Sequence, residues 1–320
     1  MVWVALFPLV HLIVACTPER LNIPQDVGSM RISNNTLITR DGVHLPLKNW
    51  APEGNPEAVI LALHGFNDYS NAFSDPAHYW AKEGFLVYAF DQRGFGATSS
   101  AGRWAGKNIL IQDLLAAVKF FSDAHPDIPL YLLGESMGGA VIIAASPHLP
   151  NNIVSGLILV APAVWARETM PLLYTATLWF AAQITPWLRL SGQGLQVQAS
   201  DNREMLIALT QDPLVIKKTR VDAMHGLVNL MDDALQNAST LLIPTLLLYG
   251  AHDEIIPKHA TAQMLLATKN EPRVLVYPSG YHMLLRDVEA DIVLRDIVDW
   301  VRDPGLAPPS GYGELWKTFF

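Results

Sequence analysis

Short apolar runs recur along the chain, and longer stretches with helical spacing of apolar residues separate them. Residues 58–63 (AVILAL) form a continuous apolar run between turn residues, which is typical of a strand buried on both faces of a sheet. Five later runs have the same character and lie at 85–90, 130–133, 153–160, 242–249 and 274–277. The pattern therefore predicts six buried strands.

Helices are predicted between these strands. Apolar residues at positions 111, 114, 115 and 118 follow the spacing of one buried helical face. The predicted helices are 71–82, 109–125, 137–145, 259–267 and 287–301. Ahead of them, segments 36–40 and 43–50 flank Asp41-Gly42, a dipeptide typical of hairpin turns. Alternation of strands and helices predicts an α/β fold, with a mostly parallel central sheet and helices on both faces.

Residues 164–239 interrupt the alternation. They contain no clear strand run and are rich in large apolar side chains. We interpret them as a helical cap inserted between two halves of a core, 31–163 and 240–303, because ligands bind at the carboxyl ends of strands in open α/β sheets. The alternative is a further hydrophobic helix pair in the core. A tail, 304–320, follows.

Composition narrows the classes of function. Half of the residues are hydrophobic and 16% are charged, as expected of an ordered globular chain. The net charge of -8 argues against a nucleic-acid partner and against docking on anionic lipid by electrostatics alone. The single cysteine excludes an intrachain disulfide, and the ten histidines are scattered. We expect no metal site.

The first 15 residues contain no Asp, Glu, Lys or Arg and are mostly apolar, as in a signal peptide. The run ends Ile13-Val14-Ala15-Cys16, which resembles the bacterial lipobox, in which the cysteine is lipidated. A tether, 16–30, follows. We therefore predict a lipid anchor at Cys16, although the basic residues that normally begin such a signal are missing. The alternatives are an uncleaved apolar anchor and a core element with a buried thiol.

A candidate nucleophile follows the strand at 130–133. Gly134-Glu135-Ser136-Met137-Gly138 lies directly between that strand and a predicted helix, the context of a G-x-S-x-G nucleophile elbow. Glycines flank the serine because the turn is sharp. The helix also points its free N–H groups at the same place. Ser136 is therefore the predicted nucleophile.

A serine needs a base to take its proton and an acid to orient that base. In the order serine, acid, histidine, Asp253 follows the strand at 242–249 and His282 follows the strand at 274–277. Both lie at strand carboxyl ends, on the edge that carries Ser136. The rival acids are Glu254 and Asp287, and the rival bases are His252 and His259.

Charge develops on the substrate oxygen, so backbone N–H groups must be aimed at it. One is expected from Met137, the residue after the nucleophile. The second is expected from the loop after residues 58–63, where Gly65 permits close approach and Phe66 presents its amide. His64 is expected to brace this loop by hydrogen bonds.

These motifs closely resemble the α/β-hydrolase superfamily, in particular its monoacylglycerol lipase and lysophospholipase branch (the serine aminopeptidase S33-like hydrolases). The resemblance covers about residues 36 to 302 and rests on His64-Gly65-Phe66, DQRGFG at 91–96, GESMGG at 134–139, Gly250-Ala251-His252-Asp253 and His282. It implies esterase or lipase activity on single-chain acyl esters, without metal or organic cofactor. It also implies that 91–96 is a structural loop, in which we expect Arg93 to act as a brace.

The sequence thus predicts a serine ester hydrolase for monoacylglycerol or lysophospholipid, lipid-anchored in a bacterial cell envelope. Four cap residues are expected to line an acyl-chain tunnel or to dip into lipid: Leu173, Trp179, Phe180 and Trp187. An alternative is an aminopeptidase-like amidase, which needs carboxylates to hold a free amine; Glu204, Asp222 and Asp232 are the candidates. A non-catalytic lipid-binding protein on the same fold is the third possibility.

Overall fold

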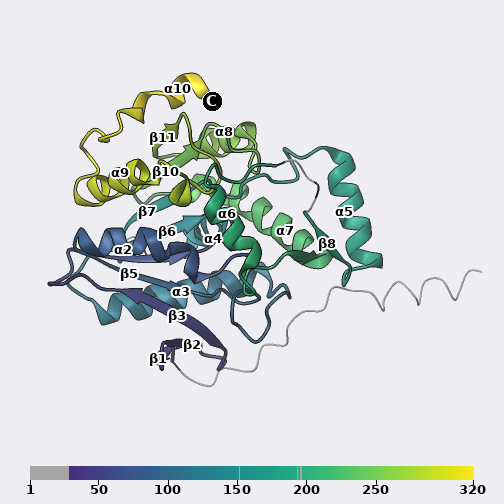
Figure 1. Ribbon diagram of the computed structural model, residues 1–320, viewed down its shortest axis with the longest axis horizontal. Coiled ribbons are helices and arrows are strands. Elements are labelled where there is room, and N and C mark those ends of the chain that lie inside the picture. The colour runs from purple at the N-terminus through teal and green to yellow at the C-terminus, as the bar shows by residue number, and fades with distance from the viewer. Residues whose placement is uncertain (1–28, 151, 193, 195–196) are drawn as a thin grey trace, which may run out of the picture.

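The computed structural model describes residues 29–320 apart from 151, 193, 195 and 196 (Figure 1). Three predicted features lie outside the described residues: the signal segment, the lipidation site Cys16 and nearly all of the tether. Within the described part, no helix is long and apolar enough to cross a membrane.

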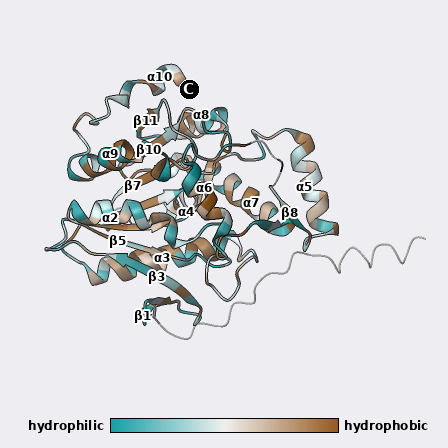
Figure 2. Ribbon diagram, in the orientation of Figure 1, coloured by the Kyte–Doolittle hydropathy of each residue, from teal (hydrophilic) through white to brown (hydrophobic). Residues whose placement is uncertain are grey.

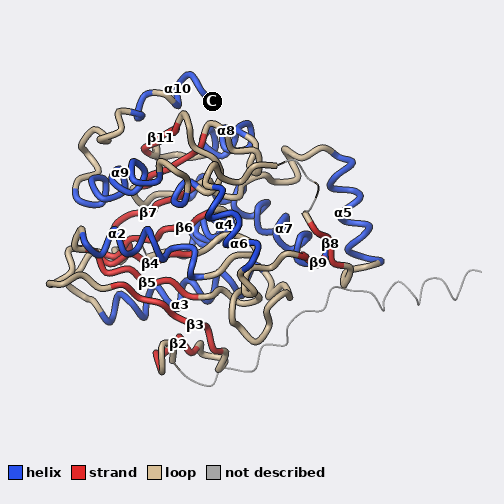
Figure 3. The backbone as a smooth tube through the Cα atoms, viewed as in Figure 1, coloured by secondary structure: helices blue, strands red, loops and turns tan. Residues whose placement is uncertain are grey.

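A nine-stranded sheet forms the centre, in the order β1-β2-β3-β5-β4-β6-β7-β10-β11 (Figure 3). The strands are β1 (Arg31–Ser33), β2 (Thr36–Ile38), β3 (His44–Trp50), β4 (Ala58–Leu63), β5 (Phe85–Phe90), β6 (Leu130–Glu135), β7 (Val154–Val160), β10 (Thr245–Gly250) and β11 (Arg273–Tyr277). Along this sheet, all pairings in the series β5-β4-β6-β7-β10-β11 are parallel. The pairings β1-β2, β2-β3 and β3-β5 are antiparallel. The predicted mostly parallel sheet is confirmed.

Both faces of the sheet are covered, because successive side chains of a strand point to opposite sides. In β4, Val59, Leu61 and Leu63 belong to one core cluster, and Ala58, Ile60 and Ala62 belong to the other. The first cluster includes side chains of α3 (Lys107–Ala124), α4 (Met137–Ala145), α7 (Val221–Asn237) and α8 (Lys258–Ala267). The second includes α2 (Ser74–Lys82) and α9 (Ala290–Arg302). Figure 2 shows the apolar residues of these central strands and helices.

The predicted elements agree with the structure to within a few residues, and the Asp41-Gly42 hairpin is present, with Ile38 opposite His44. The pattern missed β1, whose three residues are all exposed. It also missed the short helices of the tail, η6 (Tyr312–Glu314) and α10 (Trp316–Phe319). The other 3-10 helices in the described part of the chain are η2 (Ser70–Phe73), η3 (Ser146–His148), η4 (Ala238–Thr240) and η5 (Leu284–Arg286).

Between β7 and β10 the chain forms α5 (Leu172–Ile184), α6 (Arg203–Gln211) and α7. The expectation of no strand here was wrong, because β8 (Arg189–Ser191) pairs antiparallel with β9 (Lys218–Arg220). Each strand is only three residues long, too short for a periodic pattern. The two ends of the insertion differ: α7 packs on α4 in the core, whereas α5 lies at the rim of the molecule (Figure 1).

Candidate active site

Ser136 lies at the sharp turn between β6 and α4. Its backbone has φ +51° and ψ -112°, a conformation that a non-glycine residue adopts only where the surrounding structure holds it. Its N–H donates to the carbonyl of Val160 at 2.9 Å, and its carbonyl accepts from Ala163 at 2.9 Å. The turn is therefore fixed by the strand end next to it.

Close packing around the turn explains its glycines. A Cβ on Gly138 would lie 2.0 Å from the carbonyl oxygen of Leu63, so only glycine lets β4 and the helix approach each other. From 130 to 146 every residue is buried except Ser136, which is partly exposed. The fold thus presents a single side chain of this segment to the surface.

His282 and Asp253 meet at the carboxyl ends of two neighbouring strands, β11 and β10. Nδ1 of His282 lies 2.8 Å from Oδ2 of Asp253, whose side chain is fully buried. The other oxygen of Asp253 accepts from the amides of Ile255 at 2.8 Å and Ile256 at 2.9 Å. The carboxylate is therefore oriented by its own loop, and the imidazole is left with Nε2 for another partner.

The rival acids and bases hold other positions. Asp287 accepts from the Ser200 hydroxyl at 2.6 Å and from the amide of Tyr281 at 2.7 Å, and Glu254 accepts from the amide of Gln198. The ring of His252 stacks on Tyr281. Nε2 of His259 lies 3.3 Å from the carbonyl of Thr169.

The loop after β4 lies against the nucleophile. A Cβ on Gly65 would be 3.4 Å from Cβ of Ser136, which places the next residue, Phe66, beside the turn. Among the loop and turn hydrogen bonds of the described residues, neither the Phe66 amide nor the Met137 amide donates to a backbone carbonyl. Both predicted oxyanion donors thus have no backbone acceptor among these bonds, and both lie in segments that border Ser136.

His64 braces this loop, as expected. Its Nε2 accepts from the amide of Gln92 at 3.0 Å, and its Nδ1 lies 2.8 Å from the carbonyl of Gly65. Complete burial lowers the pKa of His64, and because Nε2 accepts from the Gln92 amide, Nδ1 is the nitrogen that donates. The side chain of Gln92 closes the arrangement by donating to the His64 carbonyl at 2.9 Å.

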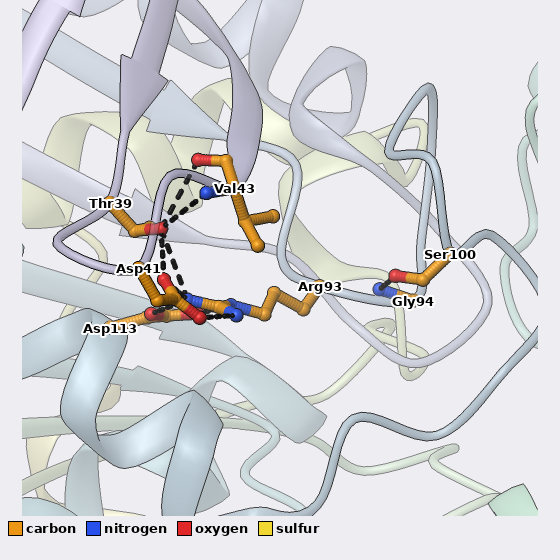
Figure 4. Close-up of polar contacts among 7 residues, drawn as sticks. All are labelled: Thr39, Asp41, Val43, Arg93, Gly94, Ser100 and Asp113. Atoms are coloured by element: carbon orange, nitrogen blue, oxygen red, sulfur yellow. Dashed lines mark hydrogen bonds and ion pairs between the residues drawn. The ribbon is translucent and has the colours of Figure 1, made fainter. Parts of the chain in front are cut away.

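Arg93 also acts as a brace (Figure 4). Its guanidinium donates to Asp113 at 2.6 and 2.9 Å and to Asp41 at 2.5 and 2.6 Å. Arg93 thereby joins the Asp41-Gly42 hairpin to α3, and burial raises the pKa of Asp113 to about 6 despite the arginine. Arg93 is tied into this cluster by several partners and serves as a structural link.

A buried charge cluster that the sequence reasoning missed lies behind Ser136. Arg286 lies 2.8 Å from Asp68 and 3.0 Å from Glu135. Burial raises the pKa of Glu135, while Arg286 and, more weakly, His282 oppose that rise. The cluster joins the loop after β4, the residue before the nucleophile and the His282 loop. A buried Glu beside the predicted serine was the one available signal, because such a group needs a cationic partner.

The four predicted cap residues lie on or next to α5 and face outward. Exposed fractions are 73% for Leu173, 55% for Trp179, 60% for Phe180 and 57% for Trp187. No residue of α5 carries a charge, and only Ala182 is buried. The four side chains therefore form an apolar outer surface in this arrangement.

Comparison with known proteins supplies the relatives of this architecture. Residues 54–289 match the family model described as serine aminopeptidase, S33. The chain is 27% identical over 284 residues to the monoacylglycerol lipase of Mycolicibacterium smegmatis, covering 86% of this chain and 98% of that protein. It is 28% identical over 274 residues to human monoglyceride lipase, covering 83% and 89%.

A solved structure shows the same fold. Monoglyceride lipase from Saccharomyces cerevisiae, a soluble variant in complex with a substrate analogue, superimposes with a TM-score of 0.71 at 18% identity. The match covers 89% of this chain and 97% of the yeast chain. The fold is therefore that of the α/β hydrolases.

Proposed function

The chain belongs to the serine aminopeptidase S33 family, and from this premise we propose that it is a serine carboxylic ester hydrolase. Its proposed substrates are monoacylglycerols or lysophospholipids. The observation that carries the proposal is the 2.8 Å contact between His282 and Asp253 at the sheet edge that carries the strained, partly exposed Ser136.

The proposed mechanism gives each group a defined role. His282 takes the hydroxyl proton as Oγ of Ser136 forms a bond to the acyl carbon. The amides of Phe66 and Met137 donate to the oxyanion, and Asp253 keeps Nδ1 of His282 protonated so that Nε2 is the base. The C–O bond then breaks, and the alcohol leaves with the proton from His282. Water repeats the sequence on the acyl-enzyme, releases the fatty acid and restores Ser136.

The apolar cap supports a lipid substrate. A large exposed apolar surface marks an interaction site, and α5 exposes several large apolar side chains and carries no charge. The curated relatives described above are named for cleavage of monoacylglycerol. We propose that α5 contacts the lipid surface from which the substrate is taken.

A fluorophosphonate probe tests the proposed nucleophile. We expect it to label the wild-type protein, with Ser136→Ala as the unlabelled control. Monoacylglycerol, lysophospholipid, a short p-nitrophenyl ester and an aminoacyl anilide then separate the substrate classes. Absence of Ser136-dependent labelling would contradict the proposal, and turnover confined to the anilide would replace it with an amidase.

The contacts of the cap carboxylates do not favour that amidase. Asp222 lies 2.5 Å from Arg220, and Asp232 forms an ion pair with Arg167. Two of the three carboxylates considered for a free amine are thus already paired with cations.

The location remains a proposal of its own: a lipid anchor at Cys16 in a bacterial cell envelope. Mass spectrometry of the mature N-terminus is expected to find lipid on Cys16. An intact Met1 would contradict it.

A further inference from the structure

The residue after the proposed oxyanion donor has an unusual backbone. Asn67 has φ +66°, which turns the chain sharply immediately after Phe66. Asparagine adopts this region more readily than other side chains, but the conformation still persists only where neighbouring structure holds it. The contacts of Asn67 therefore decide how firmly the Phe66 segment is fixed.

One short segment of the cap provides these contacts. Nδ2 of Asn67 donates to Oγ1 of Thr219 at 2.7 Å, and the carbonyl of Asn67 accepts from the amide of Ile216 at 2.9 Å. Two residues on, the hydroxyl of Tyr69 donates to Asp212 at 2.7 Å. Asp212 and Ile216 lie in the turn between α6 and β9, and Thr219 lies in β9 itself. We call residues 212–219 the latch.

The side chain of Phe66 reaches a second part of the insertion indirectly. Its ring packs edge-on against Phe95 and Trp104, with centroids 5.6 Å and 6.2 Å apart. Trp104 in turn lies on α7 at Gly226, where a Cβ would come within 2.3 Å of the indole nitrogen. The residue after Phe66 is thus held directly by the latch, and the ring of Phe66 is connected to α7 through Trp104.

The same loop borders the nucleophile on its other side, through Gly65. We infer that the latch positions the Phe66 amide for the oxyanion, and that Asn67 and Thr219 are positioning residues for ester hydrolysis. This inference rests on the proposed function. The cap then contributes to the chemical step itself as well as to substrate binding, because an oxyanion donor acts only when it is aimed correctly.

Thr219→Val removes the hydroxyl while keeping the shape of the side chain. On p-nitrophenyl butyrate, whose short chain makes little demand on the cap, we expect kcat to fall about tenfold with KM nearly unchanged, a part of the loss seen when an oxyanion donor is deleted. Thr219→Ser keeps the hydroxyl and is expected to restore the rate. Thr210→Val is the matched control, because Thr210 is exposed on α6 and its hydroxyl bonds only within that helix.

A double-mutant cycle tests whether the two residues act through one bond. Asn67→Gly accepts the same backbone conformation and lacks only the side chain. We expect Asn67→Gly/Thr219→Val to be no slower than the slower single variant, because both changes remove the same contact. A boronic acid that forms a tetrahedral adduct is expected to lose affinity in parallel with kcat.

Unfolding midpoints of every variant show whether a loss of rate reflects loss of folded protein. The inference is overturned if Thr219→Val matches Thr210→Val in kcat, if the loss falls on KM alone, or if the two changes are additive. Esterase activity in the wild type with any of these results leaves the proposed function intact. An inert wild type overturns both.

Discussion

At the scale of single residues, the two oxygens of Asp253 have separate partners. One receives the amides of Ile255 and Ile256, and the other faces His282. Because both amides donate, the atom of residue 253 that faces them must be an acceptor, and the other atom of the carboxylate must face His282. The orientation of the carboxylate therefore does not depend on the histidine.

This arrangement makes a sharp prediction for Asp253→Asn. The amide oxygen must stay with Ile255 and Ile256, so the NH2 group faces Nδ1 of His282 and forces the proton onto Nε2. We expect kcat to fall by about 10³–10⁴ with little change in KM, as when a triad carboxylate is neutralised. Kinetics on a soluble ester measure it.

Asp303→Asn, an exposed acid beyond α9, serves as the control and should retain full activity. A loss below tenfold for Asp253→Asn would assign the orienting role to another acid.

At the scale of elements, α5 is unusual because a helix of this size normally buries an apolar face. Here most of its large apolar side chains are exposed, and its contacts are with α7. Such a helix costs solubility unless it meets an apolar partner. The proposed partner is the lipid surface that carries the substrate.

Trp179→Gln/Phe180→Gln tests that role. We expect turnover of long-chain monoacylglycerol in vesicles to fall at least about tenfold, since burial of each aromatic side chain contributes about 1.5–3 kcal/mol. Hydrolysis of a short soluble ester should be unchanged. Leu266→Gln, at an 88% exposed position on α8, should change neither rate. Equal losses on both substrates would show that α5 supports the fold and not lipid contact.

Long periodic elements were predictable from the sequence because burial on both faces leaves an apolar run, as in β4. The contact of Asp253 with His282, and the position of Ser136 on the same sheet edge, were predictable because strand ends converge there. The links between segments were not: the Asp68–Arg286–Glu135 cluster and the Asn67–Thr219 bond join residues more than 150 positions apart. No local pattern encodes such contacts. The outward orientation of Trp179 likewise depends on how α5 packs.

At the scale of the whole molecule, stability depends on pH through buried acids. Burial raises the pKa of Asp287 from 3.8 to about 6, although Ser200 and Tyr281 donate to it. Between these two values the folded protein keeps a proton that the unfolded chain has lost. The contribution of Asp287 to the free energy of unfolding therefore falls as the pH rises from about 4 to about 6.

Asp287→Asn removes this titration, its amide oxygen still accepts from the N–H of Tyr281, and its NH2 group can donate to the Ser200 hydroxyl oxygen in place of the present bond. Urea unfolding at several pH values should show the free energy of unfolding of the variant rising relative to that of the wild type through this window. The expected rise is on the order of 1 kcal/mol after allowance for solvent screening, and above the window the difference should stay constant. Asp291→Asn, exposed in the first turn of α9, is the control variant in the same experiment. A difference between Asp287→Asn and the wild type that stays constant over this pH window would disprove the assignment.

The pairing of β7 directly with β10 has an evolutionary consequence. The 84 residues from 161 to 244 leave the sheet and return to it at neighbouring strands, so this segment can be exchanged between relatives without re-threading the sheet. Because α7 packs on α4 in the core, α7 must stay with the core. The exchangeable piece therefore consists of α5, β8, α6 and β9. On the inference drawn for the latch, a graft of this piece must also bring a hydroxyl to the position of Thr219. The atoms at the latch then constrain such an exchange in addition to the size and shape of the transplanted piece.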